Sequence, residues 1–437
     1  MLVSFPATAG PLLSAPPRKA TKKLELFVSG DRQSAYLAFR RVTDKYGAEV
    51  EESRRTRARY DPPALDNEPG VAALLASLGL GAFDPDGITS HVGRNDNWSG
   101  PTTTGARVFV KRLGGPSPAD NRRRFSRLLA FETLAAHAAE GVLRGPRLLG
   151  HDDEELLVAF ELLDDARSGA ELAADDAFDD ELCRIAGRIT GALHELPADP
   201  GLLDATPHPL PATDKLRALP LPAFTGATFG ELETWRLLQA DGELLEALAR
   251  LRRHERELAD RRPIHGDLRL DQFLWTPERL HLTDWEEFRL GDPARDVGAF
   301  VGEWLYFAVR GIPKAIGSEP DFTFDHETTH DEILAVGVRE LDRLRPRMTA
   351  FWDGYRSVRT TVDEGLRARA AAFAGWHMFD RMFATAMVGG RVQAADRACA
   401  GIGRTVLLSP DGFTDTLGLT EHPATPAAAT PGPGEMH

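Results

Sequence analysis

The feature that most restricts the fold is a run of polar blocks at residues 264–296, IHGDLRLDQFLWTPERLHLTDWEEFRLGDPARD. Asp267 precedes Gln272 by five residues, and Asp284 follows after the apolar segments FLW and LHL. These segments predict two short strands around a turn at Pro277, which would bring Asp284 back beside the loop that carries Asp267. The run therefore predicts a loop and hairpin that gather three oxygen-bearing side chains.

The order of these three side chains suits phosphoryl transfer. Such a site needs a carboxylate that orients the attacking hydroxyl, then an amide or carboxylate that holds a metal, and then a second carboxylate from a neighbouring strand. We therefore interpret Asp267 as the catalytic base, and Gln272 and Asp284 as metal ligands. Asp271 could replace Gln272 as a ligand if the loop turns at that point.

The same blocks resemble the motifs of the aminoglycoside phosphotransferase and choline kinase family. Its pattern is H-G-D-x-x-x-x-N, an apolar residue before D-W/F-E, and G-D-P-x-x-D-L, and this chain has HGD at 265–267, TDWE at 283–286 and GDP at 291–293 with Asp296. The resemblance implies an α+β, bilobal protein-kinase-like fold with a small β-rich N-lobe and a larger helical C-lobe, and it implies ATP and Mg²⁺ as cofactors. Gln272 stands where the family has asparagine.

The resemblance also implies a lysine for the nucleotide phosphates and a glutamate that holds it. Lys111 ends the alternating segment VFVK, and Glu132 follows 21 residues later on a predicted helix. Without the downstream motifs, Lys111 would be an ordinary charge at the end of a strand.

The segment GRNDNWSGPTTTG, residues 93–105, takes the place of the glycine-rich loop that covers ATP phosphates. Gly93, Ser99 and Gly100 are the candidate phosphate contacts, and a plain polar hairpin loop is the alternative. Backbone groups near Glu161 and Leu163, where the lobes would join, are candidates for adenine binding. The resemblance further implies that His265 shapes its loop, while Asp292 and Asp296 cap or brace the next helix.

Patterns along the chain predict four parts. Residues 1–70 form an N-terminal extension that is partly disordered, 71–163 the kinase-like N-lobe, 164–420 the C-lobe, and 421–437 a disordered tail rich in Pro and Ala. Helices are predicted over 71–78, 121–142, 179–196 and 242–261, a strand over 155–163, a strand and a helix within 24–52, and mostly helix over 331–407.

Composition limits the partners. The chain of 437 residues has a formal net charge of −14, which argues against nucleic-acid binding. The first 60 residues hold 12 basic and 6 acidic side chains, a net of +6, so this segment could attract an acidic partner or form a solvated tail. Two distant cysteines, no signal peptide and no membrane span predict a cytoplasmic protein.

A narrower resemblance connects the segments 93–113 and 265–275 with the kinase subunit of class V lanthipeptide synthetases. It implies phosphorylation of Ser/Thr side chains in a ribosomally made precursor peptide, whose leader would be acidic, with separate lyase and cyclase subunits as partners. Only six residues separate Asp284 from Gly291, which leaves no room for a long activation segment. A kinase for a small alcohol or amino-sugar, and a nucleotide-binding scaffold motivated by Gln272, are the alternatives. In either kinase the C-terminal helices would contact the acceptor, with the candidates Glu303, Trp304, Asp353, Tyr355 and Trp376.

Overall fold

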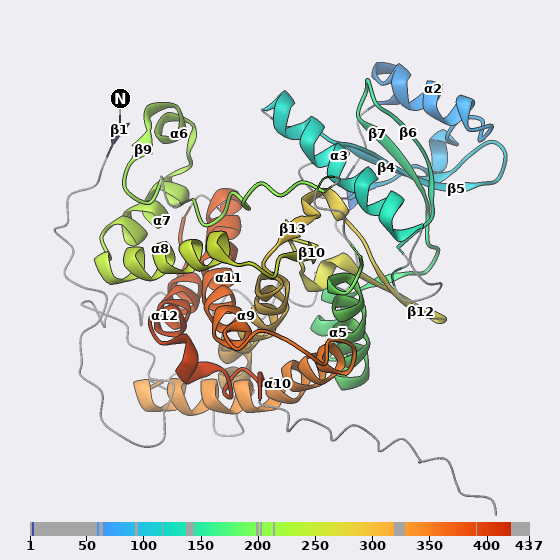
Figure 1. Cartoon of the computed structure of the whole chain (residues 1–437). Helices are drawn as coiled ribbons and strands as arrows, with labels where there is room; N and C mark the ends of the chain where they lie inside the picture. Colours follow the sequence, from blue (N-terminus) through green and yellow to red (C-terminus); the bar gives the residue numbers. More distant parts are fainter. Residues whose placement is uncertain are drawn as a thin grey trace, which may run out of the picture.

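Figure 1 shows the computed structural model of the chain, in which a strand-rich lobe sits beside a larger helical lobe. The structure describes residues 64–91, 95–115, 117–136, 143, 145–197, 201, 203–212, 215–318, 328–389 and 391–420, with the backbone of 2–3 and 59–60. This arrangement confirms the predicted α+β architecture of two lobes. The predictions for residues 24–52 and for the tail 421–437 lie outside the described residues.

The small lobe is built on a four-stranded antiparallel sheet in the order β4-β5-β7-β6. Val108 and Val110 of β5 are fully buried against Trp98 and α2, while Phe109 and Lys111 alternate with them, as predicted. The alternation therefore places Lys111 on the face opposite the core of this lobe. The elements of the lobe are α2 (Pro69–Ser77), β3 (Ser90–His91), β4 (Asn97–Pro101), β5 (Arg107–Arg112), α3 (Pro118–Ala135), β6 (Leu148–Asp152) and β7 (Leu157–Glu161).

Strand β4 differs from the predicted loop over residues 93–105. Its polar side chains are buried and paired within the lobe: Asn97 donates to the His91 carbonyl and accepts from the His91 N–H, and Ser99 bonds Thr89. Because these bonds replace those lost to water, a polar segment can form a buried strand at the edge of the sheet. Strand β6, which the sequence did not predict, pairs with β7 at the sheet edge.

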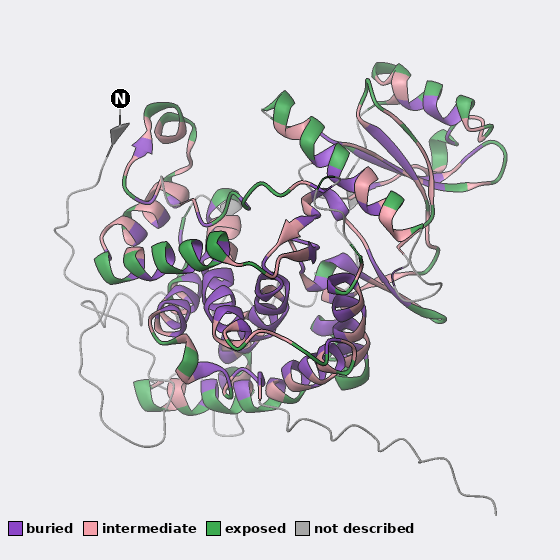
Figure 2. Ribbon diagram, viewed as in Figure 1, coloured by how far each residue is buried: buried purple, intermediate pink, exposed green. Residues whose placement is uncertain are grey.

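The large lobe is a bundle of helices around one core, whose buried residues are purple on the ribbon in Figure 2. Helices α5 and α10 approach closely at Gly187. A β-carbon there would lie 2.0 Å from the Phe351 carbonyl oxygen, so the approach requires glycine. The main helices are α4 (Gly169–Ala174), α5 (Asp180–His194), α7 (Phe229–Gln239), α8 (Gly242–Glu257), α9 (Ala294–Gly317), α10 (His330–Val358), α11 (Leu366–Gly389) and α12 (Ala394–Leu408). These confirm the helices predicted for this half.

Short strands of the large lobe carry the polar blocks of residues 264–296. Strand β11 pairs with β12 as the predicted hairpin, and β8 adds to its other edge. Strand β10 pairs with β13, so that the loop after β10 and the segment before β13 meet. These strands are β8 (Arg167–Ser168), β10 (Arg262–Ile264), β11 (Phe273–Thr276), β12 (Arg279–Leu282) and β13 (Arg289–Gly291).

Two strands of the N-terminal region pair with different lobes. β1 (Leu2–Val3) pairs with β9 (Leu219–Pro220), beside helix α6 (Leu221–Gly226) of the large lobe. β2 (Arg59–Tyr60) pairs with β3 of the small lobe. Within the described residues, no helix has the length and apolar character needed to cross a bilayer.

Candidate active site

The hairpin brings Gln272 next to Asp284, as its spacing predicted. The backbone N–H and the hydroxyl of Thr283 both donate to the carbonyl oxygen of Gln272, at 2.9 and 3.0 Å. His265 reaches the same point from the loop, where its Nε2 lies 2.8 Å from the Thr283 carbonyl oxygen. These bonds join the loop, the hairpin and the segment that carries Asp284.

Asp296 fixes the loop before Asp267. One of its carboxylate oxygens accepts from the His265 N–H at 2.7 Å and the other from the Gly266 N–H at 2.9 Å. His194 of α5 supplies a third contact at 3.1 Å, and although burial opposes its charge, these partners lower the pKa of Asp296. Asp296 therefore braces the loop rather than the helix that it was expected to brace, whereas Asp292 does bond the first turn of α9 through the Ala294 N–H.

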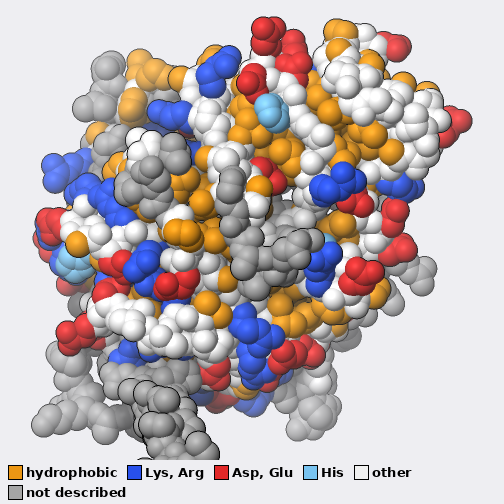
Figure 3. All heavy atoms as spheres, turned by 45° about the vertical axis from the view of Figure 1, so that its right-hand side comes forward, with side chains coloured by type: hydrophobic (Ala, Val, Ile, Leu, Met, Phe, Trp, Pro, Cys, Tyr) orange, Lys and Arg blue, Asp and Glu red, His pale blue; other side chains and the backbone are white. Residues whose placement is uncertain are grey.

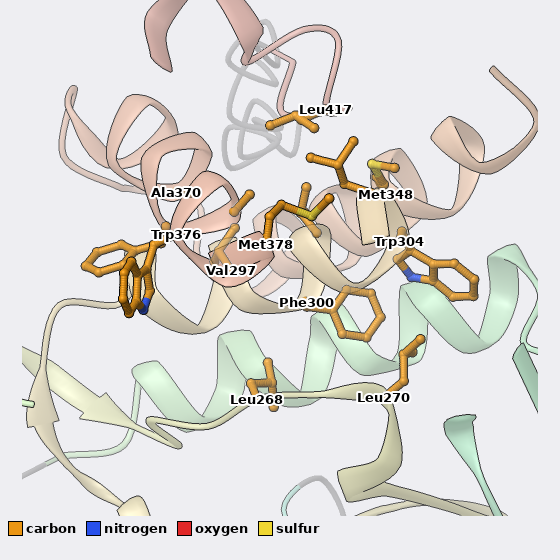
Figure 4. Packing of buried hydrophobic residues seen from close by; sticks show 14 of the residues in the cluster. Leu268, Leu270, Val297, Phe300, Trp304, Met348, Ala370, Trp376, Met378 and Leu417 are labelled. Carbon is orange, nitrogen blue, oxygen red and sulfur yellow. The ribbon is translucent and has the colours of Figure 1, made fainter. Parts of the chain in front are cut away.

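The loop itself is held by a turn and by apolar anchors. Gly266 has φ +84°, and a β-carbon there would lie 2.6 Å from the Glu287 carbonyl oxygen, so glycine is required. Leu268 and Leu270 point from the loop into the core between α5 and α9 (Figure 4), and both are fully buried. The residues on either side of Asp267 and Arg269 therefore fix where these two polar side chains emerge.

Asp267 is a carboxylate with a raised pKa. Partial burial and the nearby carboxylates of Asp380 and Asp284 raise the pKa of Asp267 to about 7, against the opposing charge of Arg269. Its side chain is 40% exposed, so an acceptor can reach it. A base whose pKa lies near neutral pH suits proton transfer from a hydroxyl.

Lys111 joins the two lobes through two carboxylates. Its Nζ bonds Asp284 and lies 2.8 Å from Glu286. Burial opposes the ammonium charge, but these two carboxylates outweigh burial and raise the pKa of Lys111. Asp284 has φ +67°, an uncommon backbone conformation for a residue other than glycine, and such positions concentrate at functional sites.

Glu286 is the residue that holds Lys111, and the prediction of Glu132 for this role is not met in the structure. Phe131 of α3 stacks on Trp285, so the next residue is turned about 100° around the helix axis. Within the described residues Glu132 makes no ion pair, and burial raises its pKa to about 7. Glu286, two residues after Asp284, takes the position that we expected a residue of α3 to take.

The partners of Glu286 extend the network into the small lobe. Arg124 of α3, only 1% exposed, donates to Glu286 at 3.1 Å and to the side-chain oxygen of Asn95 at 2.7 Å. Asn95 closes the ring by donating to Glu286 at 2.8 Å. Sequence reasoning missed these residues, although an arginine in the apolar series of α3 was a signal that a buried carboxylate would face it.

The other predicted nucleotide contacts are placed apart from this network. Gly93 lies outside the described residues. Ser99 and Gly100 lie inside β4, where the Ser99 hydroxyl bonds Thr89 and a β-carbon on Gly100 would meet the Gly87 carbonyl oxygen at 2.6 Å. In this state neither residue contacts Lys111 or the loop of Asp267, so a phosphate contact from them remains a prediction.

Glu161 and Leu163 lie at the junction of the lobes, as expected. The Glu161 N–H donates to the Arg147 carbonyl within the sheet, and its carboxylate pairs with the Arg147 side chain. Leu163 lies two residues after the end of β7, and its backbone N–H has no hydrogen-bond partner within the part of the chain that the structure describes. Leu163 is therefore the better placed of the two to bond an adenine ring.

The donor set fits a hard cation. Asp284 offers a carboxylate, and the Gln272 side-chain amide has no protein partner within the described residues, although the side chain is only 5% exposed. Mg²⁺ binds through one or two protein oxygens together with substrate phosphates. In the same ranges there is no cluster of three His, Cys, Asp or Glu side chains that would bind a metal without a substrate.

Helices α9 and α11 supply further charged side chains near the loop of Asp267. Glu303 of α9 bonds His377 at 2.6 Å and faces Arg381 at 3.8 Å, and despite burial these partners lower its pKa to about 2. Arg269 lies 3.5 Å from Asp267, and the negative charge of Glu303 is among the charges that raise the pKa of Arg269.

Glu303 is thus the predicted acceptor contact that lies near the loop. Trp304, Tyr355 and Trp376 belong to the core, where Tyr355 bonds His194. Asp353 is part of α10, on which Phe351 and Tyr355 face the core. Asp380, His377 and Arg381 could not be predicted from the sequence, because their grouping depends on how α11 packs against α9.

Comparison with solved structures finds several kinases over most of the chain. A putative fructosamine-3-kinase from Thermobifida fusca is 18% identical, with 77% of this chain and 98% of that chain covered and a TM-score of 0.45. An amicoumacin kinase in complex with AMP-PNP, Ca²⁺ and Ami is 13% identical, with 83% and 96% covered and a TM-score of 0.47. The choline kinase LicA from Streptococcus pneumoniae is 16% identical, with 73% and 99% covered and a TM-score of 0.39.

Sequence comparison gives the family. No curated protein matches the chain. The family model described as "Phosphotransferase enzyme family" (APH) matches residues 94–318, which is more than half of the chain and includes Lys111 and the blocks at 265–296. The chain is therefore a member of the APH phosphotransferase enzyme family.

Proposed function

We propose that this phosphotransferase moves the γ-phosphoryl group of ATP to a Ser or Thr hydroxyl of a ribosomally synthesised precursor peptide, as a step of lanthipeptide biosynthesis. The observation that carries the phosphoryl-transfer part is the grouping of Asp267, Asp284 and Lys111 at the junction of loop, hairpin and small lobe. A base with a pKa near 7 beside a cation and a second carboxylate is the arrangement that this reaction needs.

Each residue then has one task. Lys111 binds the nucleotide phosphates, and Gln272 and Asp284 would hold Mg²⁺, which supplies positive charge to the transferred group. Asp267 accepts the hydroxyl proton as the bond from the acceptor oxygen to the γ-phosphorus forms and the bond to the leaving ADP oxygen breaks. Arg269, at 3.5 Å from Asp267, orients this carboxylate.

What supports a peptide acceptor is the openness of the base. The Asp267 side chain is 40% exposed. A Ser or Thr on an extended peptide could therefore reach the carboxylate. The proposal includes an acidic leader on that peptide, and lyase and cyclase subunits that act on the phosphorylated product.

A second candidate is a kinase for a small amine-bearing alcohol, and Asp380 is the observation that favours it. This carboxylate lies close enough to Asp267 to raise its pKa, and it has no ion pair within the described residues. A carboxylate on the acceptor side would bind an ammonium group of an amino-sugar or choline-like molecule.

Labelled ATP with a precursor peptide, and separately with a panel of aminoglycosides and choline, tests both candidates. Transfer to Ser or Thr supports the first, and transfer only to a small alcohol supports the second. Asp267→Asn should lower kcat by about 10²- to 10⁴-fold, whereas Glu278→Gln, a matched change of an exposed carboxylate in the turn between β11 and β12, should keep most activity. Nucleotide binding without transfer to any acceptor would instead indicate a scaffold, and transfer that survives Asp267→Ala would contradict the site.

A further inference from the structure

A cavity of about 470 Å³ lies behind helix α3, away from the residues of the candidate site. The outer face of α3 forms one wall, and Leu203, Phe288 and Asp204, whose carboxylate is paired with Arg127, form the opposite wall. Both of these apolar side chains are buried, at 8% and 1% exposed. The volume is in the range of sites for organic ligands and exceeds what a single inorganic anion would fill.

The rim of this cavity is cationic. Arg122 makes one hydrogen bond within the described residues, to the carbonyl oxygen of Asp153 at 3.5 Å, which leaves its charge without a carboxylate. Among the residues that the structure describes, Arg123 pairs only with Asp120, at 3.3 Å, and both side chains are well exposed, so the pair is worth little. Arg127, by contrast, is neutralised by Asp204 and Glu287.

We infer that this cavity docks an acidic segment of the peptide substrate, with its carboxylates on Arg122 and Arg123 and an apolar side chain against Leu203 and Phe288. The inference rests on the proposed peptide acceptor. Charge complementarity supports it, because two poorly compensated guanidinium groups stand over an apolar wall. A nucleic acid fits less well, since the chain carries −14 and the face in Figure 3 shows acidic and basic side chains interspersed.

The position of the cavity would link docking to catalysis. On its inner side, α3 carries Arg124, which bonds the same Glu286 that holds Lys111. Phe288 and Glu287 belong to the segment that follows Asp284, and Glu287 bonds Arg127. A docked segment would therefore hold α3 against the segment that positions Asp284, and would lower the KM for the peptide.

A binding experiment on the full chain tests the docking itself. The probe is a short fluorescein-labelled peptide of Glu, Leu and Phe, and the control probe has Lys in place of Glu. We expect the acidic probe to bind and the Arg122→Glu/Arg123→Glu variant to weaken its binding at least about tenfold, because two charge-assisted contacts are lost. Arg250→Glu/Arg253→Glu on the exposed face of α8 is the matched control, since both side chains are exposed and the net charge changes equally.

The outcomes separate this inference from the proposed function. Equal binding of the acidic and basic probes, or equal binding by the two double variants, would overturn the docking site. If the Arg122/Arg123 variant instead changed the oligomeric state on size exclusion, the cavity would hold a second copy and the inference would be wrong. A precursor peptide that is phosphorylated with the same KM by this variant would also overturn it, while leaving the peptide kinase intact. Transfer only to small alcohols would overturn the proposed function. The fluorescence anisotropy of the labelled probe would still measure whether the cavity binds an acidic peptide.

Discussion

Replacing Glu286 tests whether the structure identifies the correct partner of Lys111. Its carboxylate accepts from Lys111 and Asn95 through one oxygen, both at 2.8 Å, and from Arg124 through the other at 3.1 Å. Glu286→Ala would leave Arg124, which is 1% exposed, without a carboxylate in the site. Breaking a buried ion pair of this kind costs about 3–5 kcal/mol, so we expect a clear fall in the unfolding temperature.

The isosteric change Glu286→Gln is the better probe of function. It keeps one oxygen acceptor and the side-chain volume but removes the charge that holds Lys111. Losing a charge-assisted bond of about 1.5–3 kcal/mol corresponds to about a ten- to 150-fold fall in kcat/KM for ATP. Steady-state kinetics with a phosphorylatable acceptor, together with a thermal melt of each variant, would measure both effects.

Glu132→Gln is the matched control. Glu132 makes no ion pair within the described residues, and its pKa of about 7 means that the side chain is already partly neutral at physiological pH. We expect kcat/KM to stay within about twofold of wild type, as for changes away from a packed or paired site. A larger loss with Glu132→Gln than with Glu286→Gln would refute the reasoning, because Lys111 would then change partners when nucleotide binds.

Three further changes probe the loop and the metal ligands. Because the pKa of Asp267 is about 7 and the base must be ionised, kcat/KM should rise as pH increases through about 7, and a flat profile from pH 6 to 8 would contradict this role. The same raised pKa means that ionising Asp267 opposes folding above its unfolded value, so Asp267→Asn should melt higher than wild type at pH 8 although its activity is lost. Gln272→Asn should keep measurable activity while Gln272→Ala loses most of it, and equal activity of Gln272→Ala and wild type would mean that the side chain binds no metal. Asp296→Ala should lower both the melting temperature and kcat without touching substrate, since about 1–3 kcal/mol is at stake for each unpaired buried donor, and an unchanged kcat would show that the loop does not depend on it.

The loop of Asp267 and the hairpin that follows it could be predicted because the sequence signals for them are local. The five-residue spacing from Asp267 to Gln272 predicts a loop, and the two apolar segments around Pro277 predict a hairpin. Neither signal depends on the rest of the fold. The same holds for β5, whose alternation of Val108 and Val110 with Lys111 set the face of the lysine.

The partner of Lys111 could not be predicted in this way, because it depends on how α3 is rotated. Helical spacing allowed Glu132 to face the lysine, but Phe131 stacks on Trp285 and turns Glu132 aside. Strand β4 was missed for a related reason. Asn97 and Ser99 are residue types typical of loops. The hydrogen bonds that hold them in a strand come from His91 of β3 and from Thr89, just before β3.

Three carboxylates lie around the loop: Asp267, Asp296 and Glu303. Their surroundings shift their pKa values in different directions, and this difference assigns them different roles. Asp296 and Glu303 are buried but have cationic or N–H partners that lower their pKa, so both stay ionised and act as fixed supports at physiological pH. Burial raises the pKa of Asp267 to about 7, helped by the carboxylates of Asp380 and Asp284 and opposed by Arg269. A carboxylate that can gain and lose a proton near neutral pH suits transfer from an alcohol, and among these three only Asp267 has such a pKa. Glu132 has a similar pKa but lies on α3 without an ion pair in the described residues, so the position of Asp267 in the loop, together with its pKa, supports its role as the base.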